Sequence, residues 1–300
     1  VATQQGKWYG VDNAGYTDIT PVHGTFTGYS NSTVITASWN GQVVFINDEI
    51  NSPMYWWPGA SGWNQIRLYD NGPDYYTWNY DVTTDTGGNI IPLYSSLTSG
   101  FVRVYNSPNV GSLLVAGNLT GNVISTGTTV NYPTSVRWSQ NFGLNSGPTT
   151  WAPTVTNVAN QLEVPLRGPA LDSFPCNGQF FLCSYWDTVV FSPINYATTS
   201  APILGIRLFN QGRGLLNANC WANTDDMVYG IDARDIWAFN GQSFVGIGNQ
   251  RVKHYFFDQL DPTYVDRIYV DCNTEKNQVE IYYPDKTAYL QNGIPNKMIS

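Results

Sequence analysis

The chain has 300 residues, a formal net charge of −8 and only 12% charged residues. Proteins that bind nucleic acids depend on clustered Lys and Arg, so this acidic balance argues against a protein that grips DNA or RNA. No stretch reaches the roughly eighteen apolar residues of a membrane span, and no signal-like segment with a basic start opens the chain. We therefore expect no membrane insertion.

The composition favours strands and turns. The chain contains 11 Trp, 20 Tyr and 13 Phe together with 28 Gly and 17 Pro. Aromatic and β-branched residues suit pleated, half-buried surfaces, whereas Gly, Pro, Asn and Asp supply the turns between strands. We expect an all-β protein.

The first clear strand pair lies near the start of the chain. Two apolar runs, residues 34–39 and 42–46, flank the pair Asn40-Gly41. Asn-Gly between such runs is a strong signal for a β-hairpin. The same pattern of a short apolar run bounded by turn residues recurs at residues 112–116, 179–183 and 187–191.

Residues 61–90 interrupt this pattern and are predicted to form aromatic and acidic insertion loops. They contain Tyr75-Tyr76 and Trp78 among the aromatic residues, with Asp81 and Asp85 among the acidic ones. Loops of this length on a compact β domain usually serve a contact or a lid. We expect them to make contacts between subunits.

Two three-stranded meanders are predicted in the last third of the chain, at residues 226–231, 235–239 and 244–248, and at 268–271, 278–283 and 288–290. Their starts lie about 40 residues apart, a period typical of propeller blades. Between them, Val252, Tyr255, Phe256 and Leu260 fall at helical intervals over residues 249–260, and a second short turn is expected at Asp261-Pro262.

These elements predict an all-β, β-propeller-like fold of antiparallel meander blades with a minor helical insertion. Residues 1–300 would form the propeller or most of one. Because the chain starts at Val1 without an initiator methionine, it can also be part of a longer polypeptide.

The sequence carries no convincing catalytic, cofactor-binding or metal site. A propeller glycosidase would need two or three carboxylates around a pocket, yet the available acids stand mostly where turns favour Asp. The candidates are Asp48, Glu49, Asp187, Asp225, Asp226, Asp232 and Asp235. His23 and His254 lack neighbours at metal-ligand spacing. We expect no enzyme and no cofactor.

Aromatic pairs keep a carbohydrate-binding alternative open. Trp56-Trp57 and Tyr75-Tyr76 could stack against sugar rings. Packing in the core or at a subunit interface, where Trp and Tyr concentrate, is the favoured interpretation.

The four cysteines include no C-x-x-C pair, which indicates neither a zinc ribbon nor a dense disulfide framework. Buried free thiols are expected at Cys176, Cys183, Cys220 and Cys272. The spacing of Cys176 and Cys183 leaves a facing pair open.

Three stretches resemble a bacteriophage tail family. They are residues 40–47 with 50–56, residues 132–139 with 148–151, and a set at 214–216, 235–241, 247–257, 266–270 and 282–284. The second carries Pro-x-x-Val-Arg-Trp-Ser at residues 133–139, and the third Asp235-Ile236-Trp237-Ala238-Phe239. Together they resemble the propeller of the tail tubular protein B family, the nozzle proteins of short-tailed phages. Gln140-Asn141 stand where that family usually has Asp-Pro, which bears on the subfamily more than on the fold.

The resemblance implies a structural protein of the virion, assembled in the host cytoplasm. It implies a homo-oligomeric ring, commonly of six copies, around the DNA-ejection channel, with adaptor and fibre proteins as partners. The genome would pass without specific binding, and six arginines would make salt bridges between subunits or between blades: Arg137, Arg167, Arg207, Arg213, Arg251 and Arg267. The alternative is a carbohydrate-binding or glycosidase propeller used in host recognition.

Overall fold

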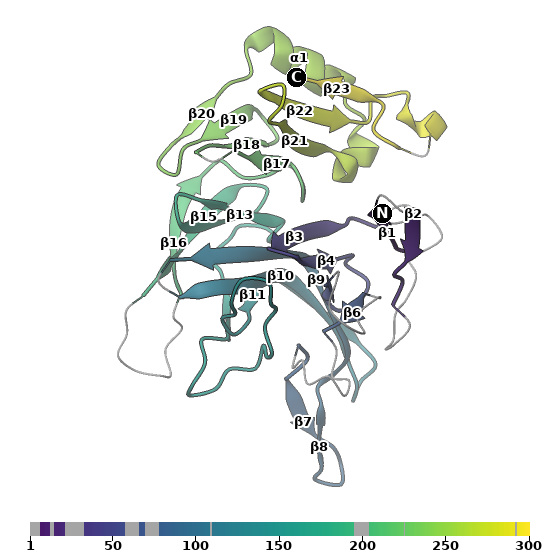
Figure 1. Cartoon of the computed structure of the whole chain (residues 1–300), viewed down its shortest axis with the longest axis vertical. Helices are drawn as coiled ribbons and strands as arrows, with labels where there is room; N and C mark the ends of the chain where they lie inside the picture. The colour runs from purple at the N-terminus through teal and green to yellow at the C-terminus, as the bar shows by residue number, and fades with distance from the viewer. Residues whose placement is uncertain are drawn as a thin grey trace. The chain divides into compact units, whose positions relative to one another are not determined.

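The computed structural model describes residues 7–12, 15–21, 33–57, 66–69, 78–108, 110–194, 204–224, 226–291 and 293–300. Figure 1 labels the strands and helices along the chain. The chain divides into two compact units: the first comprises Val1–Val164 with Pro193–Gly205, and the second Pro165–Ser192 with Ile206–Ser300.

The first unit contains two antiparallel sheets and two hairpins. One sheet has the order β3-β4-β5-β6, with strands Thr36–Asn40, Val43–Asn47, Met54–Trp56 and Arg67–Leu68. The other has the order β12-β11-β10-β9, with β9 Tyr94–Ser107, β10 Gly111–Val123, β11 Thr129–Trp138 and β12 Asn160–Glu163. The hairpins are β1 (Tyr9–Asp12) with β2 (Gly15–Asp18), and β7 (Val82–Thr84) with β8 (Ile90–Pro92).

The second unit contains three antiparallel sheets. The first runs β13-β14-β15-β16, with strands Asp172–Cys176, Gln179–Cys183, Asp187–Pro193 and Leu204–Gln211. The next runs β17-β18-β19-β20, with strands Trp221–Asn223, Val228–Ile231, Ile236–Phe239 and Phe244–Gly246. The last runs β21-β22-β23, with strands Tyr269–Asn273, Gln278–Tyr283 and Lys297–Ile299. The helices are α1 (Gln250–Gln259) and the 3-10 helices η1 (Pro262–Arg267) and η2 (Ala288–Gln291).

Every sheet is a meander in which strands that follow one another in sequence also pair side by side. Successive blades of three or four antiparallel strands, with one short helical insertion, make the fold all-β and β-propeller-like. The expected fold class is therefore confirmed. In the part of the chain described, no helix is long and apolar enough to cross a membrane.

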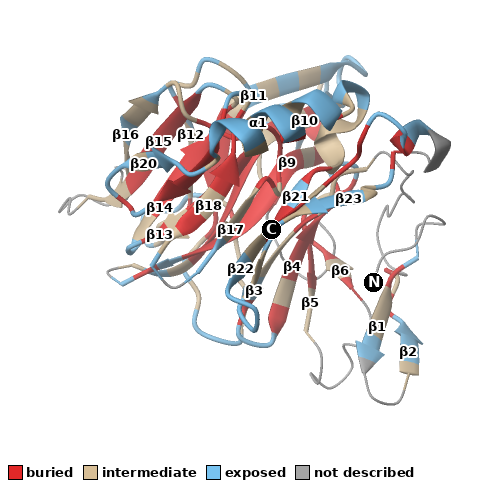
Figure 2. Ribbon diagram, turned by 90° about the horizontal axis from the view of Figure 1, so that it is seen from above, coloured by how far each residue is buried: buried red, intermediate tan, exposed pale blue. Residues whose placement is uncertain are grey.

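The inner strands of the blades are buried on both faces. In β19 all four residues are buried, and in β14 only Gln179 is not fully buried. The outer strands β16 and β20 keep most of their residues partly or fully exposed, a contrast that Figure 2 shows in colour. Continuous apolar runs therefore mark strands whose two faces are both covered, which includes the edge strand β13.

Aromatic side chains fill the core of the second unit. Phe174, Phe181, Trp237 and Phe239 are all fully buried. Phe181 and Phe239 meet edge to face with ring centroids 4.8 Å apart, an arrangement that aromatic rings prefer over a direct sandwich. The high aromatic content is thus used for packing between adjacent sheets.

Most of the local expectations are confirmed. The predicted hairpin at Asn40-Gly41 joins β3 to β4, and Gly41 has a φ of 63°, in the left-handed region that favours glycine. The predicted helix is α1, and its N-cap Asn249 accepts a hydrogen bond from the Val252 N–H at 2.9 Å. The second turn is η1, which begins at Pro262.

The strand predicted at residues 288–290 is wrong. These residues form η2, and the third strand of the last blade is β23. The Asp285 carboxylate accepts hydrogen bonds from the Thr287 N–H at 2.8 Å and from Asn296 Nδ2 at 2.8 Å. These bonds form a tight turn just after β22 and hold it against the segment that leads into β23.

The Asp285 turn should be sensitive to acid. The hydroxyl of Thr287, followed by the Asn296 amide, lowers the pKa of Asp285 from 3.8 to about 2. A carboxyl whose pKa falls on folding stabilises the protein above its unfolded pKa, and that contribution disappears as the pH falls toward the folded pKa. From about pH 5 to about pH 2, the wild type should therefore lose more unfolding free energy than Asp285→Asn. Urea titrations across this range measure both slopes, and parallel slopes would contradict the assignment.

The long hairpin of β9 and β10 depends on a glycine opposite a buried ring. Gly117 pairs with Phe101 across the two strands, and a Cβ at Gly117 would lie 2.6 Å from the Phe101 ring. Phe101 is fully buried, so the ring has no free space to move into.

Gly117→Ala should therefore destabilise the protein by about 1–3 kcal/mol through overpacking. Gly143→Ala is the matched control, because a Cβ there would meet only Ser146 Oγ, at 3.9 Å; its effect should stay within about 0.5 kcal/mol. Urea unfolding measures both, and equal stabilities of the two variants would refute the packing argument.

Candidate functional site

Two of the candidate acids shape turns between strands. Asp48 is fully buried, and its Oδ1 accepts hydrogen bonds from the N–H groups of Ile50 and Asn51 at 3.1 and 2.8 Å. Asp232 does the same for the N–H groups of Arg234 and Asp235, at 2.7 and 2.8 Å. Each carboxylate stands just after the second strand of its blade, where it replaces the hydrogen bonds that the ladder no longer supplies.

Two further candidates form ion pairs. Asp187 is 2% exposed at its side chain and binds the Arg167 guanidinium, with Nη2 and Oδ1 2.5 Å apart. Arg213 spans two carboxylates of the next blade, 2.8 Å from Asp232 and 3.2 Å from Asp235. Asp235 also pairs with Lys253 of α1 at 2.8 Å. Arg213 therefore makes a salt bridge to the next blade, as the resemblance implies, whereas Arg167, just before β13, pairs with β15 of the same blade.

The remaining candidates add no carboxylate pair. Glu49 is exposed in the turn after Asp48, with a φ of 62°, and Asp226 is exposed before β18. Asp225 lies outside the described residues. Among the described candidates, Asp232 and Asp235 share the Arg213 guanidinium, and Lys253 supplies a second positive charge at Asp235.

The two histidines and the two aromatic pairs are the remaining candidates for a catalytic or binding site. His254 is exposed on α1, and His23 lies outside the described residues. Among the described residues, no group of three His, Cys, Asp or Glu side chains could hold a metal ion. Trp56 and Trp57 are partly buried and pack against the two apolar cores of the first unit, while Tyr75-Tyr76 lie outside the described part.

All four cysteines are free thiols. Cys176, Cys183 and Cys220 are buried, whereas Cys272 is half-buried. Cys176 pairs with Gln179 and Cys183 with Asp172 in the ladder of β13 and β14, so the two cysteines stand at opposite ends of the strand pair. Burial raises the pKa of the Cys183 thiol to about 12, which keeps it protonated and unreactive.

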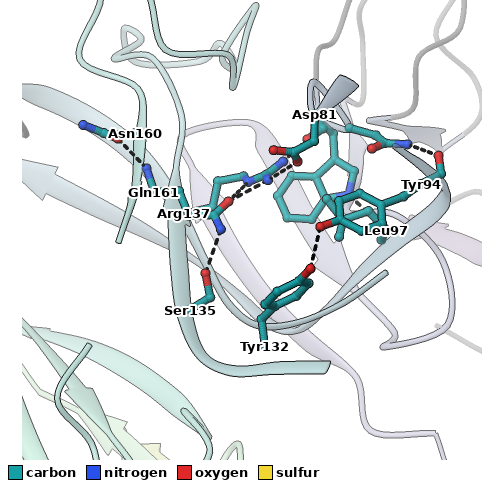
Figure 3. Close-up of polar contacts among 10 residues, drawn as sticks. Asp81, Tyr94, Leu97, Tyr132, Ser135, Arg137, Asn160 and Gln161 are labelled. Atoms are coloured by element: carbon teal, nitrogen blue, oxygen red, sulfur yellow. Dashed lines mark hydrogen bonds and ion pairs between the residues drawn. The ribbon is translucent and has the colours of Figure 1, made fainter. Parts of the chain in front are cut away.

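The most constrained polar group of the first unit is the guanidinium of Arg137 on β11 (Figure 3). Its side chain is only 1% exposed. It donates to Asp81 Oδ2 at 2.6 Å, to Gln161 Oε1 at 2.6 and 2.9 Å, and to the carbonyl of Trp78. A buried charge is tolerated when it is paired and its donors are satisfied in this way.

Aromatic rings enclose the same guanidinium. Its central carbon lies 4.2 Å from the centre of the Tyr80 ring and 5.3 Å from that of Trp78. Trp78 is fully buried and donates its indole N–H to the Leu97 carbonyl at 2.8 Å, while Asn79 Nδ2 donates to the Tyr94 carbonyl at 2.7 Å. Residues 78–81, which we call the clamped segment, are thus fixed to β9 and β11.

The clamped segment leads directly into the hairpin of β7 and β8. Its turn is shaped by Asp85, whose Oδ1 accepts hydrogen bonds from the N–H groups of Gly87 and Asn89, both at 2.8 Å. One face of the hairpin carries the cross-strand pairs Val82 with Pro92 and Thr84 with Ile90. Val82 is 60% exposed and Ile90 76% exposed. The predicted insertion at residues 61–90 therefore ends in a hairpin with a solvent-facing apolar surface, the hairpin face.

Local sequence patterns do not predict the contact between the clamped segment and Arg137. The partners Asp81 and Arg137 are 56 residues apart, so no local spacing signals their contact. The hairpin itself had a usable signal, because Gly87-Gly88 separates the β-branched runs Val82-Thr83-Thr84 and Ile90-Ile91.

Comparison with known proteins leaves the family open. No protein-family model and no curated protein sequence matches the chain. The WD40 domain of SCAP from fission yeast is similar at a TM-score of 0.30 and 9% identity, over 85% of this chain and 67% of that chain. The extracellular domain assigned to a one component system of B. thetaiotaomicron is similar at a TM-score of 0.23 and 9% identity, over 100% of this chain and 52% of that one. The chain spans about half of the latter, and neither similarity carries an inference about function.

Arg137→Lys should weaken the first unit strongly. Lysine keeps the charge but cannot reach Asp81, Gln161 and the Trp78 carbonyl at once. We expect a loss of about 3 kcal/mol in urea unfolding, because the buried cation loses its bidentate geometry and the half-buried Asp81 carboxylate and the Trp78 carbonyl lose their partner. Lys7→Ala, which breaks an ion pair with Asp18 whose two side chains are about half exposed, should have little effect, because solvent screens such a pair. Equal losses from the two variants would show that the clamp is not structural.

Proposed function

We propose that this protein is a structural component of a phage tail, a nozzle or tubular protein that forms a homo-oligomeric ring around the DNA-ejection channel. Its partners would be further copies of itself, commonly six in all, together with adaptor and fibre proteins. The observation that carries the proposal is the hairpin face, an exposed apolar surface mounted on a rigidly held root.

The hairpin face has the properties of a subunit contact. A two-stranded hairpin is at best marginally stable in water, so it gains from packing against another surface. Burying a Val or Ile side chain is worth about 1.5–3 kcal/mol, and neither Val82 nor Ile90 obtains that within the chain. Because the Arg137 contacts fix residues 78–81, the hairpin would enter an interface with little loss of entropy at its root.

The acidic residues support a structural role over a catalytic one. Asp48, Asp187, Asp232 and Asp235 serve turns and ion pairs. The stretches that resemble the phage family have the same character: Trp138 is fully buried beside Arg137, and Ser139 Oγ accepts a hydrogen bond from the Leu114 N–H at 3.0 Å. The net charge of −8 fits a channel wall that DNA passes without binding.

Substitution of the hairpin face tests the proposal. The double variant Val82→Lys/Ile90→Lys should reduce the mass measured by light scattering from a multiple of the chain to the 33.4 kDa of one copy, since a lysine pair cannot be buried in an apolar contact. Val155→Lys, at a position 71% exposed in the same unit, should leave the assembly intact.

Two results would refute the proposal. One is a wild-type protein of 33.4 kDa at every concentration. The other is cryo-EM of intact phage particles that carry this protein away from the tail axis, which would make host recognition the function to test next.

A further inference from the structure

A cavity of about 700 Å³ lies in the second unit, between the strands β17 and β18 and the strands β21 and β22. Tyr229, Cys272 and Val279 are the half-buried side chains of its lining besides Asn273, and Cys272 pairs with Val279 across the ladder of β21 and β22. The volume is within the range of about 300–1,000 Å³ that small-molecule sites occupy.

The rim of this cavity is made of amides and hydroxyls. Asn273 is held in place, since its Nδ2 donates to Glu280 Oε1 at 3.2 Å and its Oδ1 accepts from the Lys276 N–H at 3.2 Å. Asn223 and Gln278 also line the cavity, and their side-chain amides make no hydrogen bond to the described part of the chain. They remain available to a ligand as paired donors and acceptors.

The charge of the lining restricts the ligand. All nine lining side chains in the described part of the chain are uncharged. Phosphates and carboxylates are commonly bound by Arg or Lys, which these nine residues do not include. A glycosidase needs two carboxyl groups about 5–10 Å apart, and the described lining offers none. The chemistry that remains is a neutral molecule with many hydroxyl groups and one apolar face.

We infer that this cavity binds a neutral saccharide without hydrolysing it. The apolar face of a sugar ring would lie on Tyr229, and its hydroxyls would bond to the amides of Asn223 and Gln278. The inference goes beyond the structural role proposed above, and it depends on none of the residues of the hairpin face.

Cys272 provides a direct readout of occupancy. It lines the cavity, whereas the other three cysteines are buried, so N-ethylmaleimide should label Cys272 first. Burial raises the pKa of its thiol, and labelling is therefore best followed at mildly alkaline pH. The probes are the methyl glycosides of glucose, galactose, mannose and N-acetylglucosamine, with labelling followed by mass spectrometry and binding by saturation-transfer NMR.

At least one of these glycosides should slow the labelling of Cys272, with a Kd on the order of 1 mM. Tyr229→Ala should weaken this binding about tenfold in saturation-transfer NMR, through loss of the stacking surface. Gln278→Ala, at an exposed rim position, should weaken it about fivefold and serves if Tyr229→Ala does not fold. Tyr289→Ala is the matched control, because Tyr289 is 62% exposed and outside the cavity.

Three outcomes would overturn the inference. The first is an unchanged labelling rate and no saturation transfer with all four glycosides. The second is equal affinity of the wild type, Tyr229→Ala and Gln278→Ala. The third is protection of Cys272 by inorganic phosphate or methyl glucuronide in place of the neutral glycosides.

Discussion

The buried guanidinium of Arg137 is the contact on which the organisation of the first unit depends. It joins β11 to the clamped segment through Asp81 and the Trp78 carbonyl, and to β12 through Gln161. Because the Arg137 side chain is only 1% exposed, its charge is costly to bury unless its N–H donors find acceptors. β11, β12 and the clamped segment must therefore keep the positions that supply these acceptors. The orientation of the hairpin that follows is set by this requirement.

Carboxylates serve the fold in the same way in both units. Asp48, Asp232 and Asp285 each accept backbone N–H groups in the turn after a β-strand, which lets the chain reverse without unpaired donors. Arg167 links Asp187 to a neighbouring segment, and Arg213 does the same for Asp232 and Asp235. A chain with only 12% charged residues thus uses much of its charge inside its own structure. The two surfaces that we propose as binding sites are of another kind. The hairpin face is mainly apolar, and the described lining of the cavity beside Tyr229 is polar and uncharged.

Patterns that act over a few residues made much of the fold predictable. The Asn40-Gly41 hairpin, the strands of residues 179–183 and 236–239, and helix α1 each follow from neighbouring side chains. The apolar character of residues 288–290 predicts a strand, but the contact of Asp285 with Asn296, which precedes η2, has no signal in the local sequence. The Asp81–Arg137 pair and the cavity between β17–β18 and β21–β22 arise from segments distant in sequence, and one sequence without tertiary contacts cannot place them together.

Hydrogen exchange of the hairpin as a function of protein concentration tests the central claim most directly, because it needs no substitution. If the hairpin face packs against a second copy, the amides of residues 82–92 should exchange more slowly as the concentration rises, while the amides of β10, which pairs with β9 and β11 on its two sides, stay protected throughout. Exchange of residues 82–92 that is fast and identical at all concentrations would contradict the account.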